Sequence, residues 1–380
     1  MGILRPVLVA LDSSAVGNLA RDTHCAGTAE QVAAHAIREK FVNGSLIPIL
    51  TLHQIGELVA HNDSAVVSER LALLSQLPHV AFVQSLKHKG HVGSIIDIGA
   101  AEVQAIYLER LRDPADIAEF AKLKFLAFDT GRRLVAQFEG VLPELKIRLA
   151  EMRQRDRAVS SLVHVDVFKN RHQSLRKAFQ DVVGFRKDTI AAASEFARKL
   201  ASELGAHADK KAGDPSRLAR EFAQDMRPRF AKLARSEQPV LETLCAHYNV
   251  DVRAVSLDMS VEDFCWMGVF QRQLEILVET LGLPVRLTEH DVSSRMMPSW
   301  IVRREIFHAR RAATRAAGSD LSDDYLAALA CYADLTVVDK RTHAYLTQRI
   351  SKCGPLRSCL RQFTKVRNTS DLAQQLSELA

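Results

Sequence analysis

The sequence lacks three features that would each assign it to a particular class of protein. Its six cysteines are scattered, with no Cys-x-x-Cys pair and no zinc-ligand spacing, which argues against a zinc module or a disulfide framework. No apolar stretch is long enough to span a bilayer, so we expect no membrane segment. The apolar run near the N-terminus ends at Asp12 without a small-residue cleavage site, which indicates a strand and not a signal peptide. We therefore expect a cytoplasmic protein.

Aromatic residues are also few, at 6% of the chain, and most are phenylalanines at helical spacing. This pattern favours core packing over platforms for base stacking. Charge, by contrast, is plentiful and uneven. Between Arg132 and Arg235 there are 23 Lys and Arg against 13 Asp and Glu, an excess of ten, while the whole chain carries only +6. A basic region beside a more acidic one suits a protein that acts on a polyanion such as nucleic acid.

The first part of the chain alternates between strands and helices. Branched apolar runs predict strands at 3–10, 46–50 and 79–83. Between them, apolar residues at helical spacing predict helices at about 14–41, after the N-cap Thr51, and at about 64–77. Such alternation is typical of a parallel sheet with helices on both faces.

From about residue 113 helical patterns dominate, and the alternation returns only near the end of the chain. There we expect a helix at 321–332, a strand at 335–338 and a last helix capped by Ser370. The sequence therefore predicts an α/β fold in which one sheet domain is built from both chain ends, 1–112 and 296–380. An all-helical insertion, 113–295, lies between them.

Acidic residues follow two of the predicted strands. Asp12 comes after the first strand and Asp339 directly after the strand at 335–338. In an open parallel sheet, ligands bind outside the carboxyl ends of the strands. Glu57, about two turns into the helix that Thr51 caps, reaches the same edge, and Asp323 lies in the first turn of the helix before the last strand. Converging carboxylates repel one another unless a cation joins them, and Mg²⁺ and Mn²⁺ take oxygen ligands and bridge to phosphates.

The segments VLVALDSSAV, TLHQIGELVAH and SDLSDDYLAALACYADLTVVDKRT together resemble the PIN-domain nuclease superfamily. The resemblance implies a three-layer PIN-like sheet domain and Mg²⁺- or Mn²⁺-dependent phosphodiester hydrolysis. RNA is implied as substrate more than DNA, and endoribonuclease action is expected. Carried over by position, Asp12, Glu57, Asp323 and Asp339 would be catalytic metal ligands, with Asp320 as an auxiliary ligand.

The resemblance covers 1–110 and 296–380 and is specific only in the first 60 residues and at 319–346. Leu326 stands where relatives often carry histidine, and Val338 where they carry threonine or serine. Asp324 lies next to Asp323, so the third acid is ambiguous by one residue. Asp323 is preferred because it keeps the family's spacing to Asp334 and Asp339.

Basic residues flank the acidic segment on both sides. They predict contacts with nucleic-acid phosphates, and the candidates are Arg303, Arg304, Arg310, Arg311, Lys340 and Arg341. The insertion would add basic surface or a face for a homo-oligomer or protein partner. Glu102, a further acid in a predicted helix, is expected to be exposed.

Two other functions remain open from the sequence. A degenerate PIN-like fold could bind nucleic acid or act as a scaffold without catalysis, as the Leu326 and Val338 departures suggest. Alternatively, Arg303 and His308 have the R-x4-H spacing of the metal-independent HEPN ribonucleases, and Arg157 with His164 is a looser match.

Overall fold

The computed structural model describes residues 6–25, 27–151, 172–178, 198–203, 214, 216–217, 219–221, 224, 240–310 and 320–379. Its centre is a six-stranded sheet in the order β4-β3-β2-β1-β5-β6. The strands are β1 (Val7–Ala10), β2 (Leu46–Leu50), β3 (Val80–Val83), β4 (Leu126–Asp129), β5 (Leu335–Val337) and β6 (Gln362–Thr364). Paired strands run parallel, except that β4 is antiparallel to β3.

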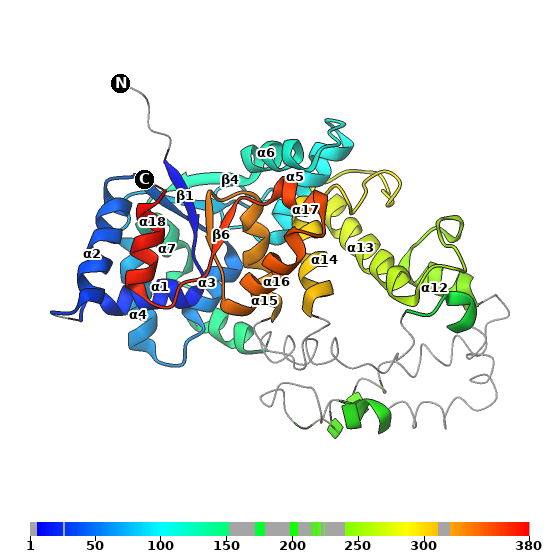
Figure 1. The fold of residues 1–380 in the computed structure, drawn as a ribbon, viewed down its shortest axis with the longest axis horizontal. Coiled ribbons are helices and arrows are strands. Elements are labelled where there is room, and N and C mark those ends of the chain that lie inside the picture. Colours follow the sequence, from blue (N-terminus) through cyan, green and yellow to red (C-terminus); the bar gives the residue numbers. More distant parts are fainter. Residues whose placement is uncertain are drawn as a thin grey trace.

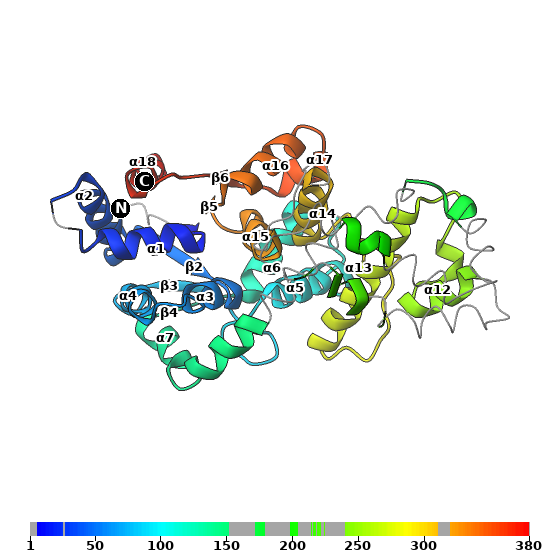
Figure 2. The same ribbon diagram turned by 90° about the horizontal axis from the view of Figure 1, so that it is seen from below.

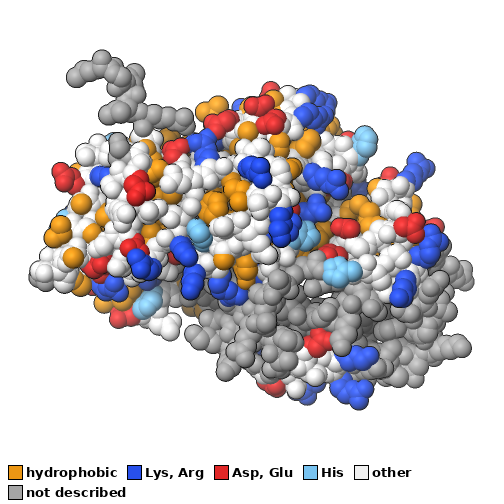
Figure 3. Space-filling model, viewed as in Figure 1, with side chains coloured by type: hydrophobic (Ala, Val, Ile, Leu, Met, Phe, Trp, Pro, Cys, Tyr) orange, Lys and Arg blue, Asp and Glu red, His pale blue; other side chains and the backbone are white. Residues whose placement is uncertain are grey.

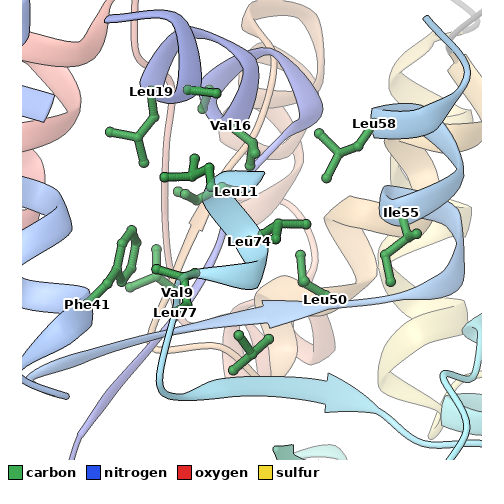
Figure 4. Close-up of a cluster of buried hydrophobic side chains, with 14 of the residues drawn as sticks. Val9, Leu11, Val16, Leu19, Phe41, Leu50, Ile55, Leu58, Leu74 and Leu77 are labelled. Carbon is green, nitrogen blue, oxygen red and sulfur yellow. The ribbon is translucent and has the colours of Figure 1, made fainter. Parts of the chain in front are cut away.

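Each face of the sheet carries its own hydrophobic core, because successive strand residues point to opposite faces. On β1, Val9 belongs to one core, whereas Leu8 and Ala10 belong to the other. The first core, shown in part in Figure 4, is covered by α1 (Ser13–Asp22), α2 (Ala29–Val42), α3 (Leu52–Val59), α4 (Ser64–Ser75), α7 (Gly131–Glu139) and α18 (Thr369–Ser377). Burying each large apolar side chain there contributes about 1.5–3 kcal/mol.

The second core lies under helices from both halves of the chain. They are α5 (Ile95–Tyr107), α6 (Pro114–Phe125), α14 (Pro298–Arg310), α15 (Asp320–Ala328), the 3-10 turn η2 (Leu329–Cys331), α16 (Lys340–Ile350) and α17 (Gly354–Cys359). The fold is therefore α/β, with helices on both faces of a mostly parallel sheet (Figures 1 and 2).

A further helical region extends away from the sheet at the end of α5 (Figure 1). It contains α12 (Val240–Tyr248), the 3-10 turn η1 (Val252–Ala254) and α13 (Val261–Thr280). Phe270 and Leu274 of α13 pack on Val103 of α5 in a third hydrophobic cluster, which ties this region to the sheet domain. Within the described ranges, no helix combines the length and apolarity that crossing a membrane requires.

The predicted α/β class and the strand at 46–50 are confirmed, but three local predictions are wrong. The helix expected over 14–41 is two helices, α1 and α2, separated by a turn. The last helix is capped by Asn368 and not by Ser370. The segment from 113 onward is not all-helical, since β4 lies within it and pairs with β3. This edge strand is only partly buried, so its sequence lacks the continuous apolar run of a central strand.

Candidate active site

The chain changes direction within the sheet between β1 and β5. From β1 it runs outward through β2 and β3 to β4, and its later part fills the other side with β5 and β6. Such a reversal in strand order opens a crevice at the carboxyl ends of the two strands beside it, where open α/β sheets bind ligands. Asp12 follows β1 and Asp339 follows β5, so both predicted acids lie at the carboxyl ends of the two strands beside this reversal.

Both aspartates also begin helices. Asp12 caps α1 and accepts a hydrogen bond of 2.6 Å from the backbone N–H of Ala15. Asp339 caps α16 and accepts one of 2.6 Å from the N–H of Arg341. Capping explains locally why aspartate follows each strand, and it fixes each carboxylate at the positive end of a helix.

The third acid, Glu57, lies on α3, which Thr51 and Gln54 cap reciprocally as the sequence predicted for Thr51. The pKa of Asp12 is raised to about 6, first by burial and then by the negative charges of Asp339 and Glu57. Hydrogen bonds from Ala15 and the Ser14 hydroxyl oppose this rise. Asp339 and Glu57 therefore lie close enough to Asp12 for their charges to act on it, and these three carboxylates are called here the acid cluster.

The neighbouring acids of α15 have different surroundings. Asp324 is buried, and its carboxylate pairs with both terminal nitrogens of Arg310, at 2.5 and 3.2 Å. Asp323 is half-buried on the same helix, which packs against α3 and α16. The buried ion pair of Asp324 favours Asp323 as the predicted third acid. Asp320 is the first residue of α15, but its side chain lies outside the described residues.

The acid cluster offers carboxylate oxygens, which are the ligands that a hard divalent cation such as Mg²⁺ prefers. Among the described residues, no group of three or more His, Cys, Asp or Glu side chains is placed to hold a metal ion directly. Mg²⁺, however, keeps several waters and is usually bound through one or two carboxylates together with substrate phosphates. A cation held in this way would also offset the repulsion that raises the pKa of Asp12.

The predicted phosphate-binding residues do not share one environment. Arg310 is wrong as a candidate, because it is buried in the ion pair with Asp324. Arg311 lies outside the described residues. Lys340 is exposed and Arg341 half-buried in the first turn of α16, directly beyond Asp339. These last two residues are therefore the candidates that lie nearest to the acid cluster along the chain.

Arg303 and Arg304 are held by neighbours on α13 and α14. The Arg303 guanidinium donates to Gln273 at 2.9 Å and lies over the Trp300 ring at 5.3 Å. Arg304 donates to His308 at 3.4 Å. Arg303 and His308 of the R-x4-H alternative thus have different partners, and Arg157 and His164 lie outside the described residues.

Basic side chains do not gather into one patch on the described part of the face in Figure 3. Lys and Arg are spread there among acidic and apolar side chains. Much of the segment 132–235, whose excess of positive charge predicted a nucleic-acid surface, lies outside the described residues.

Glu102 is completely buried, so the expectation that it is exposed is wrong. Its carboxylate accepts hydrogen bonds of 2.7 Å from the backbone N–H and the hydroxyl of Ser299, and a short one from the Tyr332 hydroxyl. Burial raises its pKa to about 7, against these hydrogen bonds. A signal was present in the sequence, since Glu102 is surrounded by small apolar residues in DIGAAEVQAIY.

His53, which the sequence analysis did not single out, lies one helical turn before Glu57. Its ring stacks on Tyr325 of α15, with centroids 4.2 Å apart, and Arg303 lies over the same tyrosine at 5.5 Å. Burial and the positive charge of Arg303 lower the pKa of His53 to about 4, so the imidazole is neutral at pH 7. The i, i+4 spacing of His53 and Glu57 was the available signal.

Comparisons with protein-family models, with curated proteins and with solved structures found no match to this chain.

Proposed function

We propose that this chain is a metal-dependent nuclease of the PIN-like type that hydrolyses phosphodiester bonds in RNA. The observation that carries the proposal is the acid cluster at the carboxyl ends of β1 and β5, where burial raises the pKa of Asp12 and the charges of Asp339 and Glu57 add to this rise. Like charges gathered at the reversal of strand order are what a cation-dependent site requires. The resemblance of the three sequence segments to PIN nucleases supports the same assignment.

In this mechanism, Asp12, Glu57 and Asp339 would hold Mg²⁺ or Mn²⁺ in part through its bound waters, with Asp323 and Asp320 as predicted further ligands. The bound ion would supply the positive charge that activates a water molecule and offsets the charge of the phosphate. Caps at Asp12 and Asp339 keep their carboxylates in place during the reaction. Lys340 and Arg341 contact the phosphate. Water adds to phosphorus and the P–O bond to the leaving nucleotide breaks, which leaves one phosphomonoester and one hydroxyl end.

One observation favours the first of the two alternatives, the scaffold without catalysis. Leu326 and Val338, which stand where relatives carry polar residues, are buried in the second core and provide no polar group to a substrate. They favour a scaffold that has lost catalysis. The HEPN-type alternative predicts cleavage that needs no metal ion. We expect the protein to act in the cytoplasm, with the helical segment serving as a surface for RNA or a protein partner.

The proposal is tested by cleavage of labelled single-stranded RNA and DNA with Mn²⁺. The wild type is compared with an Asp12→Asn/Asp339→Asn double variant and with wild type in EDTA. Loss of cleavage in the double variant and in EDTA supports catalysis by the acid cluster. Whichever of RNA and DNA is cleaved faster identifies the substrate. Nucleic acid bound but not cleaved by the wild type would favour the scaffold. Cleavage that resists EDTA but is lost in His308→Ala would favour the HEPN-type site.

A further inference from the structure

A groove of about 390 Å³ adjoins the acid cluster. It lies where α1 packs against α4, two helices that run side by side below the sheet in Figure 1. Its walls come from α1, from α4 and from the turn after α3. The lining residues are Ser13, Ser14, Gly17, Asn18, Ala20, Arg21, His61, Val66, Glu69 and Arg70.

The groove opens directly beside Asp12. Ser13 and Ser14 form the first turn of α1, which Asp12 caps. Ser13 and Ser14 both line the groove. The groove therefore begins within two residues of Asp12 along the chain.

Arg70 is fixed in this groove by two neighbours. Its Nη1 donates to the backbone oxygen of Leu58 at 3.3 Å. Its Nη2 lies over Gly17 of α1, where an added Cβ would be only 2.8 Å away. Glycine inside a helix costs about 1 kcal/mol relative to alanine. The close approach of the guanidinium therefore gives a physical reason for glycine at this position.

The charge and the size of the groove suit part of a nucleic-acid strand. Arg70 and the exposed acid Glu69 both line it, while the charge of Arg21 is paired with Asp22 at 2.8 Å. Ser13, Ser14 and Asn18 add hydrogen-bonding groups. A planar guanidinium held in place matches the geometry of a phosphate. The volume is in the range of small-molecule sites, about 300–1,000 Å³, and is too small for a duplex.

We infer that this groove binds the nucleotide next to the scissile phosphate, with Arg70 on its phosphate, so that the substrate is single-stranded at that position. The inference rests on the proposed function for the position of the scissile bond. Binding to the groove is nevertheless measurable without any cleavage.

The test is the affinity of fluorescent single-stranded RNA and DNA octamers, and of the same octamers as duplexes, measured by anisotropy in EDTA. Arg70→Met should weaken single-strand binding about 10-fold or more, since a hydrogen bond between charged groups is lost. It should also flatten the plot of log affinity against log salt by about 0.7, the contribution of one phosphate contact on a single strand. Arg38→Met is the matched control, because Arg38 bonds Gln76 outside the groove.

Asn18→Lys is a second variant. It adds a cation to the groove and leaves the hydrogen bond from Arg70 to Leu58 in place. It should tighten single-strand binding and steepen the salt dependence. Unchanged affinity and salt slope in both Arg70→Met and Asn18→Lys, or equal binding of duplex and single strand, would overturn the inference. Absence of metal-dependent cleavage by the wild type would instead contradict the proposed nuclease, while the binding result would still decide whether the groove holds nucleic acid.

Discussion

Aspartates lie at both the amino ends and the carboxyl ends of β1 and β5, but in opposite electrostatic environments. At the amino end, Asp334 accepts hydrogen bonds from the N–H of Leu8 at 2.8 Å and from Arg361 at 2.9 Å. At the carboxyl end, burial raises the pKa of Asp12 to about 6, and the charges of two further acids, Asp339 and Glu57, add to this rise. A carboxylate neutralised by arginine holds strands together, whereas carboxylates that repel one another weaken the fold and are kept where they bind a cation.

The largest expected effect compares these two ends directly. Asp12→Asn should lower metal-dependent cleavage at least about 100-fold, because even residues that only orient metal ligands contribute 10–100-fold. Its thermal stability should stay the same or rise, since asparagine still caps α1 and a repelling charge is gone. Asp334→Asn should do the reverse, costing about 1–3 kcal/mol of stability and leaving the cleavage rate of the folded protein unchanged. Equal loss of cleavage in both folded variants would contradict the comparison.

The same contrast exists between adjacent residues on α15. Asp324→Asn should destabilise the protein by about 3–5 kcal/mol, because it leaves the buried Arg310 without its carboxylate. Asp323→Asn should cost less stability than Asp324→Asn, because Asp323 is only half-buried, but it should abolish cleavage. Urea unfolding and Mn²⁺-dependent cleavage measure the two effects. A stable, inactive Asp324→Asn beside an active Asp323→Asn would reassign the third acid to Asp324.

Glu102 provides a third environment, in which the effect of burial is opposed by hydrogen bonds from Tyr332 and Ser299 and, less, by the charge of Arg303. Its pKa is raised from 4.5 to about 7, so the folded state binds the proton more tightly than the unfolded state. Stability from this group is complete below pH 4.5 and is lost as the pH rises through 7, by on the order of 3 kcal/mol.

Glu102→Gln should remove this pH dependence. Denaturant unfolding of both proteins between pH 5 and 8 measures it as the difference between wild type and variant. The variant curve is subtracted from the wild-type curve because His53 also makes stability depend on pH. Its pKa is lowered to about 4, so the protein loses stability from this group as the pH falls below 6.5. Parallel stability curves for the two proteins would show that Glu102 is ionised at all these pH values.

Central strands could be predicted from the sequence, whereas edge strands could not. β2 is buried along its whole length and has five apolar or proline residues in LIPIL. β4 and β6 are half-exposed at the two edges of the sheet, so their residues follow no apolar pattern, and pairing with β3 and β5 determines their conformation. Local sequence alone does not contain that pairing.

The candidate site shows the same limit. Asp12 and Asp339 could be placed because a residue that follows a parallel strand lies at the carboxyl edge whatever the rest of the fold does. The small apolar neighbours of Glu102 indicate that it is buried, but not its partner Ser299, which lies 197 positions away in the chain. Arg310 was taken for a surface residue because Asp324, which buries its charge, comes from a different helix.

The smallest expected effect concerns the proton on Asp12. With a pKa of about 6, this carboxyl is about half protonated at pH 6 in the absence of metal. Mn²⁺ binding favours the ionised form, so it should release about half a proton at pH 6 and almost none at pH 8. Calorimetric titration in buffers of different ionisation enthalpy measures this release, and Asp12→Asn is the control that should release none. If Mn²⁺ binds without releasing a proton at pH 6, the ion lies away from Asp12 and the two ends of the sheet do not differ in the way proposed.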